Sequence, residues 1–210
     1  MTFTVDRRIA ELLCSRICHE LVAGVAAINN GVELISEIDP SMFEEAMELI
    51  GSSAKQASAR VQYYRMAYGF AGYDALSSMA AVGELVSGLI ATESRYSVEL
   101  PRAASPPLQA GWGKLLLNLL VMGMECLPRG GTVVPAVVAA DGKAIISVIA
   151  RGDEARVPDR YREILDGTIA PEAVSALNVH AFYTAAMAGA VGRGIEIDID
   201  GGTAILRVGA

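Results

Sequence analysis

The chain has 210 residues, of which 52% are hydrophobic and 20% charged, a composition typical of a globular protein with ample apolar material for a core. The formal net charge is −7 and no basic patch stands out, which argues against a nucleic acid or an anionic membrane as the main partner. No run approaches the roughly eighteen apolar residues of a membrane span, because Lys114 and Asn118 interrupt the most hydrophobic stretch.

Residues 1–8 lack the basic-then-apolar order of a signal peptide, so we expect a cytoplasmic protein. In that compartment Cys14, Cys18 and Cys126 are expected to be reduced thiols. A metal site built from Cys14, Cys18 and His19 is disfavoured. The two thiols share one helix face, the imidazole points away from it, and no fourth ligand is evident.

The N-terminal third has the pattern of a helical hairpin. Residues 6–38 contain no proline, and apolar residues recur there at alternating spacings of four and three, the seam of a helix packed against near-parallel neighbours. This seam consists of Cys14, Cys18, Leu21, Val25, Ile28, Val32 and Ile35. After a break at Asp39-Pro40, Ser41 and Glu44 indicate a capping box for a second helix over about 42–68.

The second helix also has an apolar stripe, formed by Phe43, Ala46, Met47, Ile50, Ala54, Ala57 and Val61. Two long helices with so short a connection form an antiparallel hairpin. Because a lone hairpin cannot cover its own apolar face, we expect two chains to pair as a homodimer with a four-helix bundle.

After a linker at about 69–73, the long helical pattern gives way to shorter predicted helices and strands. We therefore expect a hairpin domain over residues 1–70 and a second domain over residues 71–210. Helices are predicted over about 74–91, 108–127, 158–165 and 178–191, and strands over about 94–100, 132–139, 143–150, 194–199 and 203–208. Asp141-Gly142 and Asp200-Gly201-Gly202 are hairpin turn signals. The predicted fold class is α+β, with an α/β sandwich in which helices cover one face of a sheet.

His19 is the first candidate functional residue. At about 100° per residue, it lies roughly 140° from the apolar seam of its helix. The same count places further residues on that outer face: Arg16, Ala23, Ala26, Asn30, Glu33 and Glu37. We therefore expect an exposed imidazole beside a flat surface of small residues, which another protein could approach.

The chemistry of imidazole suits phosphoryl transfer, because near neutral pH it is both a nucleophile and a leaving group. It can accept a phosphoryl group from an aspartyl phosphate and return it to another aspartate. Glu20 could orient or polarise the ring, and Arg16, one turn earlier, could steady the phosphoryl oxygens. The alternative is an ordinary surface histidine on a bundle helix, which is the commoner case for a lone histidine. His180 lies on an apolar helix and is expected in the core or at its boundary.

Five segments resemble the ChpT family of dimeric histidine phosphotransferases: CSRICHEL at 14–21, AINNGVEL at 27–34, EAMELIGSSA at 45–54, LPRGG at 127–131, and residues 185–197. The first segment also resembles, more distantly, the phosphoacceptor box of sensor histidine kinases. The resemblance implies a dimeric bundle and a second domain like a degenerate kinase ATP-binding domain. It further implies a phosphorelay from the receiver domain of a hybrid histidine kinase to response regulators of the cell cycle, of the CtrA type. Receiver partners would supply Mg²⁺, so no cofactor is expected in this chain.

Nucleotide binding is not expected, because the boxes that such kinases use are altered. Met122 stands where the resemblance places a metal-binding asparagine, and residues 150–155 replace the loop that reads adenine. The glycine-rich box expected before the last long helix is missing. Gly192 follows that helix and is interpreted as its C-terminal turn and not as part of a phosphate-binding loop. A true kinase is therefore disfavoured, and the main alternative to a phosphotransferase is a non-catalytic dimeric scaffold that docks receiver domains.

The resemblance also suggests where partners dock, on the outer face of both hairpin helices. The candidates are Ala23, Ala26, Asn30, Glu33, Glu44 and Glu48. The second domain could lend extra contact surface to a response regulator. One departure from the family pattern is Gly24, which stands where the family has a proline and permits a bend without forcing one.

Overall fold

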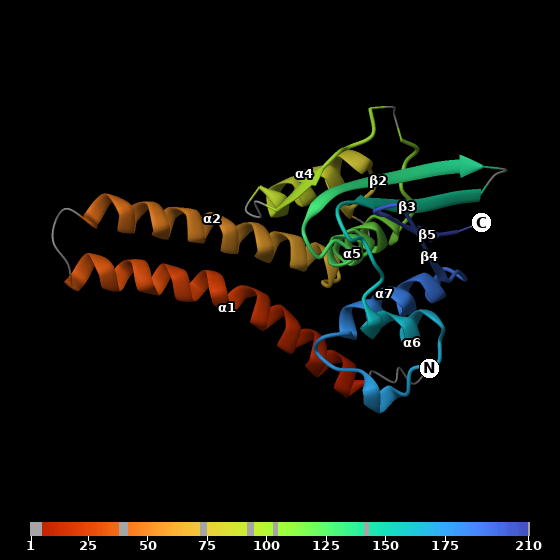
Figure 1. The fold of residues 1–210 in the computed structure, drawn as a ribbon, viewed down its shortest axis with the longest axis horizontal. Helices are drawn as coiled ribbons and strands as arrows, with labels where there is room; N and C mark the ends of the chain where they lie inside the picture. The colour runs from red at the N-terminus through yellow and green to blue at the C-terminus, as the bar shows by residue number, and fades with distance from the viewer. Residues whose placement is uncertain are drawn as a thin grey trace.

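The computed structural model describes residues 6–37, 42–71, 75–91, 95–102, 105–140 and 143–209. A helical hairpin projects from a compact part of mixed helices and strands (Figure 1). The helices are α1 (Arg7–Glu37), α2 (Phe43–Ala67), α4 (Met79–Ile90), α5 (Trp112–Glu125), α6 (Arg162–Leu165) and α7 (Val179–Ala190), with 3-10 turns η2 (Asp159–Tyr161) and η3 (Pro171–Ala173). The strands are β1 (Tyr96–Val98), β2 (Gly131–Ala140), β3 (Lys143–Arg151), β4 (Ile195–Asp200) and β5 (Thr203–Val208).

The predicted hairpin is confirmed, and α1 is one continuous helix that passes through Gly24. Gly24 and Gly31 are both buried on the face that packs against α2. A Cβ atom at Gly24 would lie 3.1 Å from the Cβ of Ala57, and one at Gly31 would lie 2.5 Å from Cγ1 of Ile50. Gly24 therefore serves close approach of the two helices, a packing reason for a small residue where the family pattern has proline.

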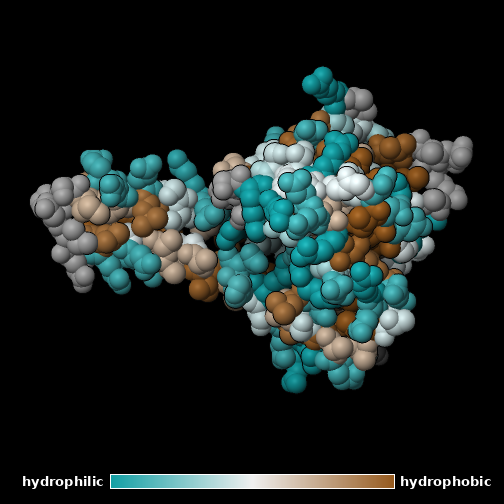
Figure 2. All heavy atoms as spheres, viewed as in Figure 1, coloured by the Kyte–Doolittle hydropathy of each residue, from teal (hydrophilic) through white to brown (hydrophobic). Residues whose placement is uncertain are grey.

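The predicted apolar seam lies largely on the outside of the hairpin. Val25 and Val32 of α1 are 52% and 54% exposed, and both cysteines of the seam are exposed as well. The stripe on α2 is open in the same way, with Phe43 and Val61 each 48% exposed. Hydrophobic side chains are visible along the projecting hairpin (Figure 2). A single chain thus leaves one apolar face of its hairpin uncovered.

The second part is an α/β sandwich, as predicted. Within the described residues the sheet has five strands in the order β1-β2-β3-β5-β4, with β1 parallel to β2 and the other pairs antiparallel. Alternate strand residues such as Val133, Val148 and Leu206 are fully buried, while the residues between them are partly exposed or exposed. This alternation shows that the helices cover one face of the sheet. The apolar helix α5 lies at the centre of that core.

Several element boundaries differ from the prediction. The helix expected from residue 74 begins at Met79, because the hydroxyl of Ser78 accepts a hydrogen bond from the backbone N–H of Ala81 and caps it. The helix expected from residue 108 begins at Trp112, after Gly111 in the left-handed conformation. Ser41 lies outside the described residues, and Met42 caps α2 without a side-chain hydrogen bond.

The predicted turns have mixed outcomes. Residues 141–142 and part of the predicted linker lie outside the described residues. Gly201 and Gly202 have φ of 48° and 81°, which confirms the turn between β4 and β5. Gly192, which follows the C-cap residue Val191 of α7, has a φ of 75° and ends that helix, as predicted.

The hairpin and the second part share one core. Tyr63 of α2 is fully buried against α5, and its hydroxyl donates a hydrogen bond to the carbonyl of Leu117 at 2.6 Å. Asn118 donates to the carbonyl of Ala67 at 2.8 Å, and Lys114 donates to that of Tyr68 at 3.2 Å. Side chains of α5 therefore satisfy the terminal carbonyls of α2, which otherwise have no helical partner.

Candidate functional site

His19 lies on α1 with its side chain exposed, as the helical wheel predicts. Ala23, Ala26 and Asn30 are exposed on the same face. Because these neighbours are small, the imidazole stands beside a shallow surface that a protein partner can approach. Glu20 is partly buried and turned towards the second part of the chain, where it lines a small cavity.

The structure corrects the predicted position of Arg16. The wheel places Arg16 on the open face with His19, but its side chain is only 13% exposed. Its Nη2 atom lies 2.5 Å from Oε1 of Glu125 at the end of α5. Burial lowers the pKa of the Arg16 guanidinium, but the attraction and hydrogen bond of Glu125, with smaller contributions from Tyr68 and Glu20, together outweigh burial and raise that pKa. Arg16 is therefore committed to an ion pair between the hairpin and the second part.

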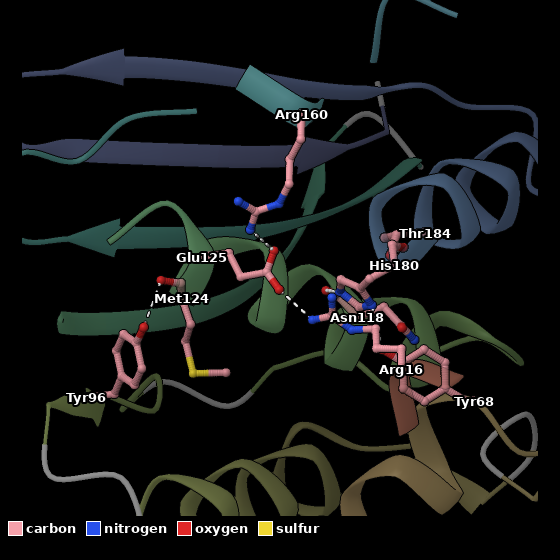
Figure 3. Close-up of polar contacts among 9 residues, drawn as sticks. All are labelled: Arg16, Tyr68, Tyr96, Asn118, Met124, Glu125, Arg160, His180 and Thr184. Carbon is pink, nitrogen blue, oxygen red and sulfur yellow. Dashed lines mark hydrogen bonds and ion pairs between the residues drawn. The ribbon is translucent and has the colours of Figure 1, made fainter. Parts of the chain in front are cut away.

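Glu125 holds a second arginine as well. Its Oε2 atom lies 2.9 Å from Nη2 of Arg160, so one carboxylate joins α1, α5 and the η2 turn (Figure 3). Arg16, Glu125 and Arg160 form what we call the arginine–glutamate cluster. Nothing in the local sequence pairs these three residues. The one available signal is that Glu125 is the lone carboxylate of a largely apolar helix, where an unpaired charge is costly.

Two adjoining cavities border this cluster. The smaller, of about 130 Å³, is lined by Arg16, Glu20 and Arg60 from the hairpin and by Arg95, Tyr96 and other residues from the second part. The larger, of about 500 Å³, shares four lining residues with it and continues towards η2. The shared residues are Arg95, Tyr96, Met124 and Glu125. A cleft therefore runs from the residue next to His19 across the second part of the chain.

The other histidine has the opposite environment. His180 is fully buried, with Nε2 at 3.0 Å from the carbonyl of Asn118 and Nδ1 at 2.7 Å from the hydroxyl of Tyr68. Since a carbonyl only accepts, Nε2 carries the proton and Nδ1 accepts from Tyr68. Burial lowers the pKa of His180 to about 4 and raises that of Tyr68. The prediction of a core histidine is confirmed, and its burial keeps it from any protein partner.

Residues at the altered nucleotide boxes belong to the core. Met122 and Ala150 are both fully buried. A thioether in that environment offers a hard cation such as Mg²⁺ no oxygen ligand. Across the described ranges, no group of three or more His, Cys, Asp and Glu side chains is placed to hold a metal ion.

The remaining docking candidates lie on the hairpin. Glu33 is exposed on α1, and Glu44 and Glu48 are exposed on the first turns of α2. The side chain of Glu37 lies outside the described residues. In the part of the chain that is described, no helix is both long and apolar enough to cross a membrane.

Comparison with known proteins agrees with this architecture. Residues 80–203 match the family described as histidine phosphotransferase C-terminal domain. The chain is 36% identical over 192 residues to the protein phosphotransferase ChpT of Brucella abortus (strain 2308), which covers 89% of this chain and 88% of that protein. It also matches a solved bacterial phosphotransferase with a TM-score of 0.84 and 30% identity, over 100% of this chain and 98% of the other. Because the family match spans more than half of the sequence and the identity extends over most of both chains, the chain belongs to the histidine phosphotransferase family.

Proposed function

We propose that His19 is the phosphoacceptor of this histidine phosphotransferase and that it carries a phosphoryl group between receiver domains in a two-component phosphorelay. The observation that carries the proposal is the exposure of His19 on a shallow face of α1, whereas His180 is fully buried. The chain has only these two histidines. A protein partner therefore has one imidazole within reach.

The proposed transfer is a substitution at phosphorus. The P–O bond of the aspartyl phosphate on the donor receiver breaks, a P–N bond forms on the imidazole of His19, and the aspartate leaves as a carboxylate. The same step in reverse passes the group to a second receiver. Such transfer depends on positioning and charge neutralisation, for which the receiver's own Mg²⁺ suffices. The donor is the receiver of a hybrid histidine kinase, and the acceptors are response regulators of the cell-cycle, CtrA type.

The same chemistry assigns supporting roles on the hairpin. Glu20, next to His19, orients the ring from the partly buried side of the helix. The exposed surface of Ala23, Ala26 and Asn30 receives the receiver domain, with Glu33, Glu44 and Glu48 as further contacts. The uncovered apolar face of the hairpin supports a homodimer with a four-helix bundle, because a second copy presents the same stripe to it.

A transfer assay tests the proposal. A phosphorylated hybrid-kinase receiver is mixed with the wild-type protein, with His19→Ala, and with Ser15→Ala as a control on an exposed residue of the same helix. We expect an acid-labile phosphate on the wild type and on Ser15→Ala and none on His19→Ala. A lack of label on the wild type with every receiver tried would falsify the proposal.

The second candidate is a scaffold that docks receivers without transfer. The exposed docking surface on α1 is compatible with it, so binding alone does not separate the two. A scaffold binds receivers equally well with or without the imidazole and never becomes labelled. Binding of His19→Ala together with labelling of the wild type therefore favours the phosphotransferase.

A further inference from the structure

The arginine–glutamate cluster joins two segments that lie far apart in sequence. Arg16 and Glu125 are 109 residues apart, yet their side chains are only 13% and 18% exposed and lie in direct contact. Arg160 completes the cluster from a third segment and is 43% exposed. Figure 3 shows Glu125 reaching between the two guanidinium groups. A largely buried carboxylate with an arginine on each oxygen is held in one place, because neither oxygen can turn away without leaving a charge unpaired.

The cluster is positioned to control α1 in particular. The end of α2 is already fastened to α5 by hydrogen bonds from Tyr63, Lys114 and Asn118. On α1 the contacts differ, because Arg8 reaches two backbone carbonyls near η3 and Arg16 reaches Glu125. Arg16 lies three residues before His19, nearly one helical turn away. Its ion pair with Glu125 therefore ties α1 to the second part within one helical turn of His19.

The cleft lined by Glu20, the residue after His19, has one wall from the hairpin and one from the second part. Glu20 and Arg60 belong to the hairpin wall, while Arg95 and Tyr96 belong to the wall of the second part. Glu125 lines both cavities of the cleft. Because Glu20 lines this cleft and directly follows His19, the placement of the two walls bears on the fit of a receiver at His19.

We propose that Glu125 is a positioning residue for phosphotransfer, which holds Arg16 and Arg160 together and thereby sets the angle between α1 and the second part of the chain at the face that a receiver meets. This inference rests on the proposed role of His19. Glu125 touches neither the phosphoryl group nor the imidazole in this scheme. It acts on the fit of the receiver.

The test measures the initial rate of transfer from a phosphorylated receiver against receiver concentration. We expect Glu125→Gln, which keeps the shape and loses the charge, to raise KM about tenfold and to leave the maximal rate within about twofold. Arg16→Gln is expected to do the same, and the double variant no more than either single variant, because all three break one cluster. Glu125→Asp retains the charge, and its KM is expected to lie between those of Glu125→Gln and the wild type. The control is Asp198→Asn, which breaks an ion pair with Arg207 on the β4–β5 strands.

A small phosphoryl donor separates positioning from chemistry. Phosphoramidate loses ammonia as its P–N bond breaks and a new P–N bond forms on His19, and it needs no docking surface. We expect the wild type, Glu125→Gln and Arg16→Gln to be labelled by it at the same rate. Slower labelling of Arg16→Gln alone, with a reduced maximal rate from the receiver, would show that Arg16 acts on the phosphoryl group and would overturn the proposal.

Folding and function can also be told apart. Circular dichroism shows whether Glu125→Gln folds. If it does not, Arg160→Gln is used instead, because it removes only the more exposed of the two ion pairs of Glu125, and it should still raise KM for the receiver. If a folded variant has an unchanged KM, the positioning role of Glu125 is overturned, whereas labelling of His19 still supports the proposed function. A wild type that no receiver labels instead removes the proposed function itself.

Discussion

The two histidines show how surroundings decide the chemistry of one residue type. His19 stands on an open helix face, whereas His180 is enclosed and has both ring nitrogens engaged by Asn118 and Tyr68. A buried imidazole avoids the charged form because protonation in the core has no water to stabilise it. His180 is therefore a neutral structural link between α7, α5 and α2.

This burial predicts a pH dependence of stability. The pKa of His180 is lowered to about 4 in the folded protein, against 6.5 for an unperturbed histidine. Between these values the unfolded chain binds more protons than the folded one, so the free energy of unfolding decreases as the pH falls from 6.5 towards 4. We expect this contribution to reach about 3 kcal/mol, measured by urea unfolding at several pH values. His180→Gln should lower the free energy of unfolding at neutral pH. The part of its decrease between pH 6.5 and 4 that comes from His180 should be absent in this variant. An equal slope in both proteins would contradict the assignment.

At the scale of elements, the hairpin depends on close contact between α1 and α2. Gly24 and Gly31 are spaced seven residues apart and face Ala57 and Ile50 on the other helix. Residues seven apart return to nearly the same helix face, so both glycines lie on the line of contact. Their small size lets the helix axes come together without a gap.

Adding one methyl group at this contact should destabilise the fold. A Cβ at Gly31 would lie 2.5 Å from Cγ1 of Ile50 and 3.3 Å from the carbonyl oxygen of Ala46. We expect Gly31→Ala to reduce the free energy of unfolding by about 1–3 kcal/mol, because the neighbours must move. Gly88→Ala is the matched control, since its Cβ meets nothing within 4 Å in α4, and it should gain up to about 1 kcal/mol from helix propensity. Thermal or urea unfolding compares the two, and equal effects would contradict this account.

Across the whole molecule, the second part braces one end of the hairpin and leaves the other end projecting (Figure 1). The projecting end carries the exposed apolar stripe of Val25, Val32, Phe43 and Met47. A row of exposed apolar side chains along a helix is typical of a protein interface. The same stripe on a second chain is its simplest cover, in the proposed four-helix bundle.

A charge on that stripe should separate the proposed dimer. Val32 is 54% exposed, and a glutamate there would bring two buried carboxylates to the symmetric interface. We expect Val32→Glu to elute as a monomer, with its mass measured by light scattering, while the wild type elutes as a dimer. Asn30→Glu adds the same charge on the His19 side of α1 and should remain dimeric. A monomeric wild type would rule out the homodimer.

The sequence predicts some elements well and others poorly, for physical reasons. Apolar residues recur at a regular spacing along the whole of α1. This spacing predicts both the length of α1 and the exposed helix face that carries His19. The predicted start of α4, at about residue 74, lies five residues before Met79, because apolar periodicity does not reveal that the Ser78 hydroxyl caps the helix. The predicted exposed position of Arg16 is wrong, because a helical wheel contains no information about Glu125, whose charge draws the Arg16 side chain inward.

By itself the sequence determined the hairpin, the open face of His19, the burial of His180 and the sandwich that follows. Each of these follows from local periodicity and turn chemistry, which act over a few residues. Only the tertiary structure decided that Arg16, Glu125 and Arg160 meet beside a cleft next to the His19 helix. A contact between residues 109 apart in sequence depends on how whole helices and strands pack. A buried charge must be paired with an opposite charge, and the tertiary packing determines which one lies close enough.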